Sequence, residues 1–199
     1  MKVIVAVGTG NSGCSAIHDF ITESTKYISP FEGHEFRILD DPDGIINLYH
    51  NFYKNPSINN YSNSIMRFKN YVNNLSELKM KVDNKGKKIF NKKIISLSEQ
   101  YIDDITTLNY NAIPQFIALQ TNYFKKKYLN FKKNIFSINN KNQDVFKMYL
   151  PVKKDIFLKK SKIFISKIIK LHLKNLNSKY IILDQSINIL NYQNIFSYF

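Results

Sequence analysis

A glycine-rich segment near the amino end of the chain has the residue types of an anion-binding loop. Gly8, Gly10 and Gly13 follow an apolar stretch directly, and Ser15 comes two residues later in the sequence GTGNSGCS. Glycines let the main chain approach a charged group and direct several amides toward it. If the loop continues into a helix, the first helical amides and the helix dipole favour an anion at the same place. The segment therefore predicts a phosphate or sulfate site.

The loop fits two phosphate-binding patterns at once. Its three glycines fit GxGxxG, and Gly8 with Gly13 also fits the GxxxxG of a Walker A loop. Cys14 and Ser15 then stand where a Walker A loop carries lysine followed by serine or threonine. The structural alternative is a tight turn that only connects a strand to a helix.

The segment VAVGTGNSGCSAI resembles the 5′-phosphosulfate loop of the sulfotransferases. In that family a strand is followed by a basic or polar residue, by Ser-Gly-Thr/Ser-Thr/Ser and by a helix, and the loop binds 3′-phosphoadenosine 5′-phosphosulfate. Asn11 is neutral at the position where the family often has a basic residue that stabilises the departing bridge oxygen. The co-substrate-binding residues that the resemblance implies are Gly10, Asn11, Ser12, Gly13, Cys14 and Ser15.

The resemblance also implies a catalytic base on the next strand. In the glycan sulfotransferases this base is a glutamate, and the matching residue in GHEFRI is Glu35, with His34 as the neighbouring candidate. An acceptor hydroxyl must lose its proton as it attacks sulfur, and a carboxylate or a neutral imidazole can accept it. Arg37 is expected to orient anionic groups of the substrate. The implied reaction is sulfuryl transfer to an acceptor hydroxyl, for example of a glycan, with no metal ion; a surface glutamate at a strand edge is the alternative.

Three other hypotheses for the chemistry start from single residues. Asp184 follows YIIL as a Walker B aspartate follows its strand, and Ser15 could share Mg²⁺ with it in a P-loop kinase or NTPase. A dinucleotide-binding protein would use Asp40 or Asp41 for the ribose hydroxyls. Cys14 could be a nucleophile with a lowered pKa at a helix amino end, although the sequence places no histidine to activate it. Metal-ligand spacing is absent among the histidines on the predicted helices, His18, His50 and His172.

The charge balance favours anionic partners. The formal net charge is +14, but Arg37 and Arg67 are the only arginines, and lysine lacks the planar fork used for base recognition. Nucleic acid is therefore not expected, and a basic polyanion-binding module around Tyr123 to Tyr128 (YFKKKY) is the third-ranked hypothesis. Lysines that only form solvated helix faces are the structural alternative.

The cysteine and hydropathy patterns predict a soluble, cytoplasmic protein. Cys14 is the only cysteine, so the chain has no intramolecular disulfide and no cysteine-based zinc cluster. The apolar run Val3 to Val7 is shorter than a secretory signal requires, and no stretch approaches the about 18 apolar residues of a membrane span.

The elements that must position these residues belong to an α/β fold. We expect a P-loop-type parallel sheet flanked by helices, formed by one domain over residues 1–199, with a largely helical insertion at 57–177. The predicted strands are 2–7, 35–39 and 179–184. The predicted helices are 13–26, 44–53, three helices within 57–134 that are separated at 83–88 and at Pro114, then 154–177 and a tail from 187 to 199.

The end of the chain carries the last part of the resemblance. The sequence YIILDQSINILNYQNIFSYF is similar to the stretch before the 3′-phosphate-binding strand of the sulfotransferases, which normally carries Arg-Asp-Pro-Arg and a following serine. Because Phe199 precedes any such motif, we expect the domain to be incomplete at its carboxyl end.

Overall fold

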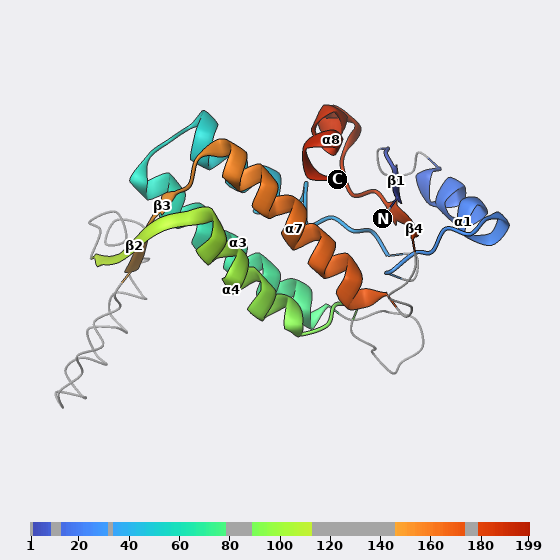
Figure 1. The fold of residues 1–199 in the computed structure, drawn as a ribbon, viewed down its shortest axis with the longest axis horizontal. Helices are drawn as coiled ribbons and strands as arrows, with labels where there is room; N and C mark the ends of the chain where they lie inside the picture. Colours follow the sequence, from blue (N-terminus) through green and yellow to red (C-terminus); the bar gives the residue numbers. More distant parts are fainter. Residues whose placement is uncertain (1, 9–12, 32–33, 79–88, 113–145, 174–178) are drawn as a thin grey trace, which may run out of the picture.

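The fold combines a small parallel sheet with a larger group of helices. The computed structural model describes residues 2–8, 13–31, 34–78, 89–112, 146–173 and 179–199. Figure 1 shows β1, β4 and α1 together at one end of the described chain, three long helices α3, α4 and α7 at its centre, and the β2–β3 pair at the opposite end. The chain is therefore α/β, as the hydrophobic pattern predicts.

The parallel sheet joins the two ends of the chain. Strand β1 (Lys2–Ala6) pairs in parallel with β4 (Tyr180–Asp184), and Ala6 lies opposite Asp184 at the carboxyl end of the pair. Both strands are rich in β-branched residues, which favour a pleated and half-buried surface. The predictions for these two strands are confirmed.

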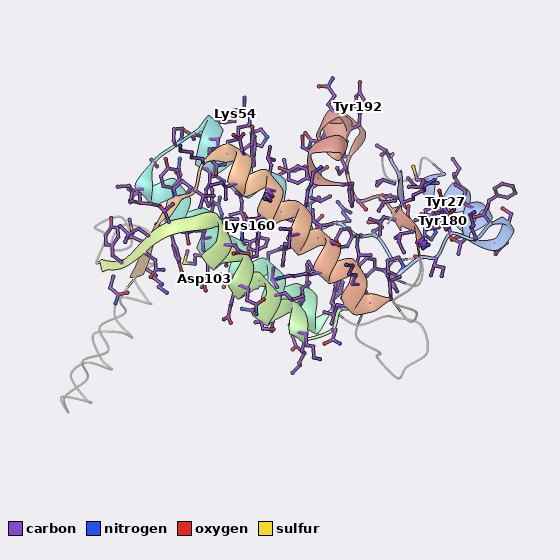
Figure 2. All side chains as sticks on the ribbon, in the orientation of Figure 1. Tyr27, Lys54, Asp103, Lys160, Tyr180 and Tyr192 are labelled. Atoms are coloured by element: carbon purple, nitrogen blue, oxygen red, sulfur yellow. The ribbon has the colours of Figure 1, made fainter. Side chains whose placement is uncertain are left out.

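A third extended segment borders β4 on the side away from β1. The amide of Ile28 donates to the carbonyl of Tyr180 at 3.1 Å, and the amide of Ile182 donates to the carbonyl of Ile28 at 3.1 Å. Figure 2 shows Tyr27 and Tyr180 side by side at this edge, and their ring centroids are 5.4 Å apart. Ile28 therefore adds a single parallel bridge to the edge of β4 that faces away from β1.

The predicted strand over 35–39 is wrong. Glu35 and Phe36 have no regular secondary structure, and residues 37–40 form turns, in which the amides of Asp40 and Asp41 both donate to the carbonyl of Arg37, at 3.1 and 2.9 Å. Phe36, Ile38 and Leu39 are all 0% exposed, so the apolar residues of this stretch are buried without strand pairing, while Arg37 between them is exposed. A short apolar run cannot reveal whether it is buried in a sheet or in a compact turn.

The helices of the amino-terminal half begin close to the positions that we predicted. Helix α1 covers Cys14–Ser24, and α2 (Ile45–Tyr49) continues into a π-helical turn, η1 (His50–Lys54). Helix α3 (Ile58–Glu77) begins after Ser57, whose hydroxyl accepts a hydrogen bond from the Asn60 amide at 3.0 Å. This side-chain cap satisfies one of the amides that a helix leaves unpaired at its amino end.

Three long helices form a large part of the hydrophobic core. Helices α4 (Lys93–Ile105) and α7 (Lys154–His172) pack against each other and against α3. The rings of Tyr101 and Phe164 stack with centroids 4.3 Å apart, and Phe68 meets both of them. At the solvent side Lys160, labelled on α7 in Figure 2, donates to Asp104 of α4 at 2.8 Å.

The middle of the chain also contains a strand pair that the prediction of a largely helical insertion at 57–177 did not include. Strands β2 (Thr106–Ala112) and β3 (Phe146–Pro151) form an antiparallel pair. The sequence TTLNYNA has the β-branched and aromatic residues of a strand. Because this segment directly follows the amphipathic pattern of helix α4, the sequence pattern does not predict a strand here. The third predicted helix, the break at Pro114 and the basic stretch at Tyr123 to Tyr128 lie outside the described residues.

The carboxyl-terminal segment returns to the parallel sheet and then packs on α7. After β4 the chain forms a 3-10 helix, η2 (Ile189–Asn194), and a last turn, α8 (Ile195–Tyr198). Asp40 joins this segment to the turn before α2, because its carboxylate accepts from the Asn188 amide and the Asn191 side chain, both at 2.6 Å. Over the described ranges, no helix combines the length and the hydropathy needed to cross a membrane.

Candidate functional site

The candidate site lies where β1, β4 and α1 meet. The amide of Gln185 donates to the carbonyl of Ala6 at 3.1 Å, which closes the carboxyl end of the two paired strands. Helix α1 starts only a short loop after β1 and packs on both strands. In parallel α/β sheets, ligands bind at the carboxyl ends of the strands, beside helix amino ends. The elements thus bring the predicted loop to the edge where such a site is expected.

Gly13 supplies the backbone conformation that starts α1. Its φ is +80°, in the left-handed region, and it caps the helix without any side-chain hydrogen bond at that end. A Cβ built at Gly13 would meet nothing within 4 Å, so the need for glycine is conformational and not steric. The first amides of α1 consequently have no side-chain acceptor at the cap and suit an anion.

Ser15 and Asp184 are in direct contact. The Ser15 hydroxyl donates to Oδ2 of Asp184 at 2.9 Å, although the two residues are 169 positions apart in the chain. Asp184 is 2% exposed, whereas Ser15 is exposed. The other carboxylate oxygen of Asp184, Oδ1, is buried and has no hydrogen-bond partner. A buried oxygen of this kind is costly unless a ligand, a cation or water satisfies it.

A carboxylate at this position changes the electrostatics of the loop. A bound phosphate beside Asp184 would face a like charge, and the repulsion is strong where water is excluded. A divalent cation between the two groups removes this penalty, and Mg²⁺ is usually bound by one or two carboxylates together with substrate phosphates and waters. Ser15 and Asp184 are oxygen ligands of the kind that Mg²⁺ takes. Within the described residues, no three His, Cys, Asp or Glu side chains cluster as metal ligands.

The segment with the candidate base also reaches the carboxyl end of β4. The amide of Phe36 donates to the carbonyl of Asp184 at 3.1 Å, so its neighbours Glu35 and Arg37 lie beside this strand end. Nη1 of Arg37 donates to Glu35 at 3.2 Å, and Nε donates to Asp41 at 2.8 Å. Burial lowers the pKa of Arg37, but the carboxylates of Asp41 and Glu35 outweigh it and raise the pKa. Arg37 therefore remains a cation.

His34 is near this segment but has a different environment. Its amide donates to the carbonyl of Phe31 at 3.0 Å, and its Nε2 atom is buried without a hydrogen-bond partner.

Cys14 is 6% exposed, in the first turn of α1. A buried thiol at this position fits the role of a small packing residue better than that of a nucleophile.

The remaining predicted site residues fall into two groups. Gly10, Asn11 and Ser12 lie outside the described residues, so the structure places only the second half of the loop. Asp40 and Asp41, the candidates for ribose recognition, are both engaged inside the chain, by Asn188 and Asn191 and by Arg37 and Tyr71 respectively. These internal contacts disfavour the dinucleotide-binding hypothesis.

Two features of the site could not be found from the sequence. Ser186, two residues after Asp184, is fully buried with an unpartnered hydroxyl beside the strand end. Tyr71 of α3 donates to Oδ2 of Asp41 at 2.8 Å and thereby connects the long helices to the candidate site. Neither residue belongs to a recognisable motif, and only the fold brings them here.

Comparison with known proteins adds no family to this picture. No family model, no curated protein and no solved structure matches the chain. The fold and the side-chain contacts are therefore the basis for a functional proposal.

Proposed function

We propose that this chain binds the phosphate or phosphosulfate end of an adenine nucleotide at the β1–α1 junction and transfers a group from it. The observation that carries the proposal is the contact between Ser15 and Asp184. It brings a hydroxyl and a buried carboxylate with one unpartnered oxygen to the amino end of α1. Gly13 at φ +80° starts α1 without a side-chain cap hydrogen bond, and the amino end of a helix suits an anion. The adenine part rests on the sulfotransferase resemblance alone.

One candidate reaction is sulfuryl transfer from 3′-phosphoadenosine 5′-phosphosulfate to an acceptor hydroxyl, possible acceptors including glycans. Its support is the resemblance of the loop, together with the position of Glu35 beside the carboxyl end of β4. In this reaction Glu35 would accept the proton of the hydroxyl as sulfur is attacked, and His34 is the alternative base. Sulfuryl transfer in the resembling family does not use a metal ion.

The second candidate reaction is phosphoryl transfer from a nucleoside triphosphate. The Ser15–Asp184 contact favours it specifically, because a carboxylate next to a phosphate is unfavourable without a cation and this pair provides ligands for Mg²⁺. Mg²⁺ would supply neutralisation of the charge on the phosphate oxygens. The position of the usual Walker A lysine is occupied by the buried Cys14. The cation that replaces the lysine in this reaction would have to come from elsewhere in the chain.

A calorimetric titration tests the shared proposal and separates the two reactions. The purified chain is titrated with 3′-phosphoadenosine 5′-phosphosulfate and with ATP, each in the presence of Mg²⁺ and then of EDTA. Binding of the phosphosulfate in EDTA supports sulfuryl transfer, and binding of ATP only with Mg²⁺ supports phosphoryl transfer. If neither nucleotide binds under either condition, the proposal is wrong.

A further inference from the structure

The turn before α2 is held to helix α3 by two contacts one helical turn apart. The Tyr71 hydroxyl donates to Oδ2 of Asp41 at 2.8 Å, and Nε of Arg67 lies 2.9 Å from Oδ1 of Asp43. Asp43 has a φ of +68°, and Pro42 lies between the two acids. Positions i and i+4 of a helix point to the same side, so a single face of α3 fixes both ends of this turn.

Asp41 passes this constraint on to Arg37. Oδ1 of Asp41 accepts from Nε of Arg37 at 2.8 Å, while Oδ2 accepts from Tyr71. The Asp41 side chain is 21% exposed. Burial of the Tyr71 hydroxyl raises the pKa of Tyr71, and the nearby Asp41 carboxylate raises it further, so Tyr71 remains a neutral donor. Tyr71, Asp41 and Arg37 thus form a chain of two short hydrogen bonds that leads from the long helices to the candidate site.

The second contact of Arg37 is weaker and more accessible. Its Nη1 donates to Glu35 at 3.2 Å, and these two side chains are 54% and 36% exposed. Exposed ion pairs contribute little free energy, so an incoming anion can displace Glu35 from the guanidinium at small cost. A phosphate offers several oxygens to the planar guanidinium group and can accept hydrogen bonds from two N–H groups along one of its edges.

The backbone between these residues is fixed to the sheet. Phe36 is fully buried, its ring stacks on Phe31 with centroids 4.9 Å apart, and its amide bonds to the carbonyl of Asp184. Glu35 and Arg37 are therefore held beside the carboxyl end of β4 whether or not their side chains are paired. Only the ion pair between the Glu35 and Arg37 side chains can be replaced by a contact with a ligand.

We infer that Tyr71 is a positioning residue that, through Asp41, holds Arg37 ready to bind a nucleotide phosphate in place of Glu35. This inference rests on the proposed function, because it takes the β1–α1 junction as the phosphate site. In this inference Arg37 supplies the positive charge that a Walker A loop obtains from its lysine, whose position is occupied here by Cys14. It also implies that phosphate binding releases the Glu35 carboxylate from its ion pair.

The two arginines of the chain make a direct spectroscopic test possible. With Arg37 and Arg67 as the only arginines, a ¹H–¹⁵N spectrum contains two arginine Nε–H signals, and substitution of each arginine by lysine assigns them. Addition of the nucleotide that binds in the calorimetric titration is expected to shift the Arg37 signal and to leave the Arg67 signal in place. In Tyr71→Phe the Arg37 signal is expected to move or broaden before any nucleotide is added.

The affinity of Tyr71→Phe for the nucleotide is expected to fall about 2- to 10-fold, the range for loss of one hydrogen bond. Tyr61→Phe is the matched control, since Tyr61 lies on the same helix and packs its ring on Phe52. Asp41→Asn, which keeps the size of the side chain and removes its charge, should reproduce the effect. An unshifted Arg67 signal in each variant shows that the turn and α3 remain folded.

The results separate failure of this inference from failure of the proposed function. If nucleotide shifts the amides of Gly13 and Ser15 but not the Arg37 signal, or if Tyr71→Phe binds like Tyr61→Phe, Tyr71 does not position a phosphate-binding group. If those amides do not respond to nucleotide at all, the proposed site itself is wrong.

Discussion

Asp184 dominates the electrostatics of the candidate site at the scale of single residues. Its carboxyl group is buried next to a loop that suits anions, and only Oδ2 is paired, with Ser15. Burial of a charge that is only partly hydrogen-bonded is unfavourable, and such arrangements concentrate at ligand and metal sites. The Ser15–Asp184 pair is therefore the residue pair most worth changing first.

Asp184→Asn tests whether a cation belongs between the loop and β4. Under phosphoryl transfer, this variant should lose at least 10-fold in ATP affinity with Mg²⁺ and differ little from the parent in EDTA, because Mg²⁺ loses a charged ligand. Ser15→Ala should show the same pattern more weakly. Calorimetry with and without Mg²⁺ measures both. Equal losses in Mg²⁺ and in EDTA would show that Asp184 supports the fold and does not bind a cation.

Glu35→Gln tests the base in the sulfuryl-transfer hypothesis. Loss of a general base typically lowers the rate about 10²- to 10⁴-fold, and the Gln variant keeps the size of the side chain. The measurement is transfer of labelled sulfate from 3′-phosphoadenosine 5′-phosphosulfate to a glycan acceptor, at a nucleotide concentration that saturates both proteins. His34→Ala run in parallel identifies the imidazole if it is the base. An unchanged rate in Glu35→Gln would remove Glu35 from the mechanism.

The sequence allowed prediction of those site residues that belong to local patterns. Gly13 and Ser15 follow a glycine motif, and Asp184 ends an apolar strand, so their types and positions indicated phosphate or Mg²⁺ chemistry. The kinase or NTPase hypothesis placed Ser15 near Asp184 by analogy, but the pairing of β1 with β4 that brings them into contact across 169 positions is not encoded by a local pattern. Tyr71 was missed because a tyrosine at helical spacing is indistinguishable from a core residue until its partner Asp41 is seen.

At the scale of elements, the two glycines with described surroundings are required for different reasons. Gly13 is needed for its positive φ, with open space where a Cβ would lie. Gly44, before α2, has an ordinary φ of −76°, but a Cβ there would lie 2.6 Å from the Ile38 carbonyl oxygen and 2.9 Å from that of Asp41. Ile38 belongs to the segment 35–39 that the sequence predicts as a strand, and Asp41 belongs to the turn that follows it.

This difference predicts an order of stability for the two alanine variants. Gly13→Ala should lower the free energy of unfolding by about 1 to 2 kcal/mol, the cost of a left-handed conformation for a residue with a Cβ. Gly44→Ala should cost more, since the backbone of the turn must shift, and overpacking typically adds about 1 to 3 kcal/mol. Urea unfolding followed by circular dichroism measures both. The opposite order would contradict the turn geometry at Gly44.

Prediction succeeded where an element has its own pattern and failed where it depends on tertiary packing. The continuous apolar strands β1 and β4 and the amphipathic helices α3, α4 and α7 were all visible in the sequence. The stretch 35–39 has the composition of a strand, yet tight packing around Phe36 and Leu39 makes it a turn, and Ile28 pairs with β4 instead. Strand β2 was overlooked because it follows α4 without any break.

At the scale of the whole molecule, the sheet end and the long helices share one hydrophobic core over the described residues, which includes Ile181 and Leu183 of β4. His172 at the end of α7 contacts Phe31, a member of this core. Its ring lies 4.9 Å from that of Phe31 and 5.5 Å from that of Phe90, centroid to centroid. Nε2 of His172 lies 3.0 Å from the amide nitrogen of Asn91, and its Nδ1 lies 2.8 Å from the carbonyl oxygen of Ile168. These contacts require a neutral imidazole, with Nδ1 as donor and Nε2 as acceptor.

The neutral state of His172 predicts how stability depends on pH. Burial lowers the pKa of His172 in the folded chain, while an unfolded histidine titrates near pH 6.5. Between the lowered pKa and about pH 6.5 the unfolded chain thus binds more protons, and the free energy of unfolding falls as the pH falls through this window. Below the lowered pKa both states are protonated and the His172 contribution no longer changes. In His172→Gln, which is neutral throughout, this part of the pH dependence should disappear, whereas His50→Gln at an exposed position should retain it. Urea unfolding of the three proteins from pH 7.5 to pH 5 measures the difference. If the free energy of unfolding depends on pH in the same way in the parent and in His172→Gln, the contacts of His172 do not require a neutral imidazole.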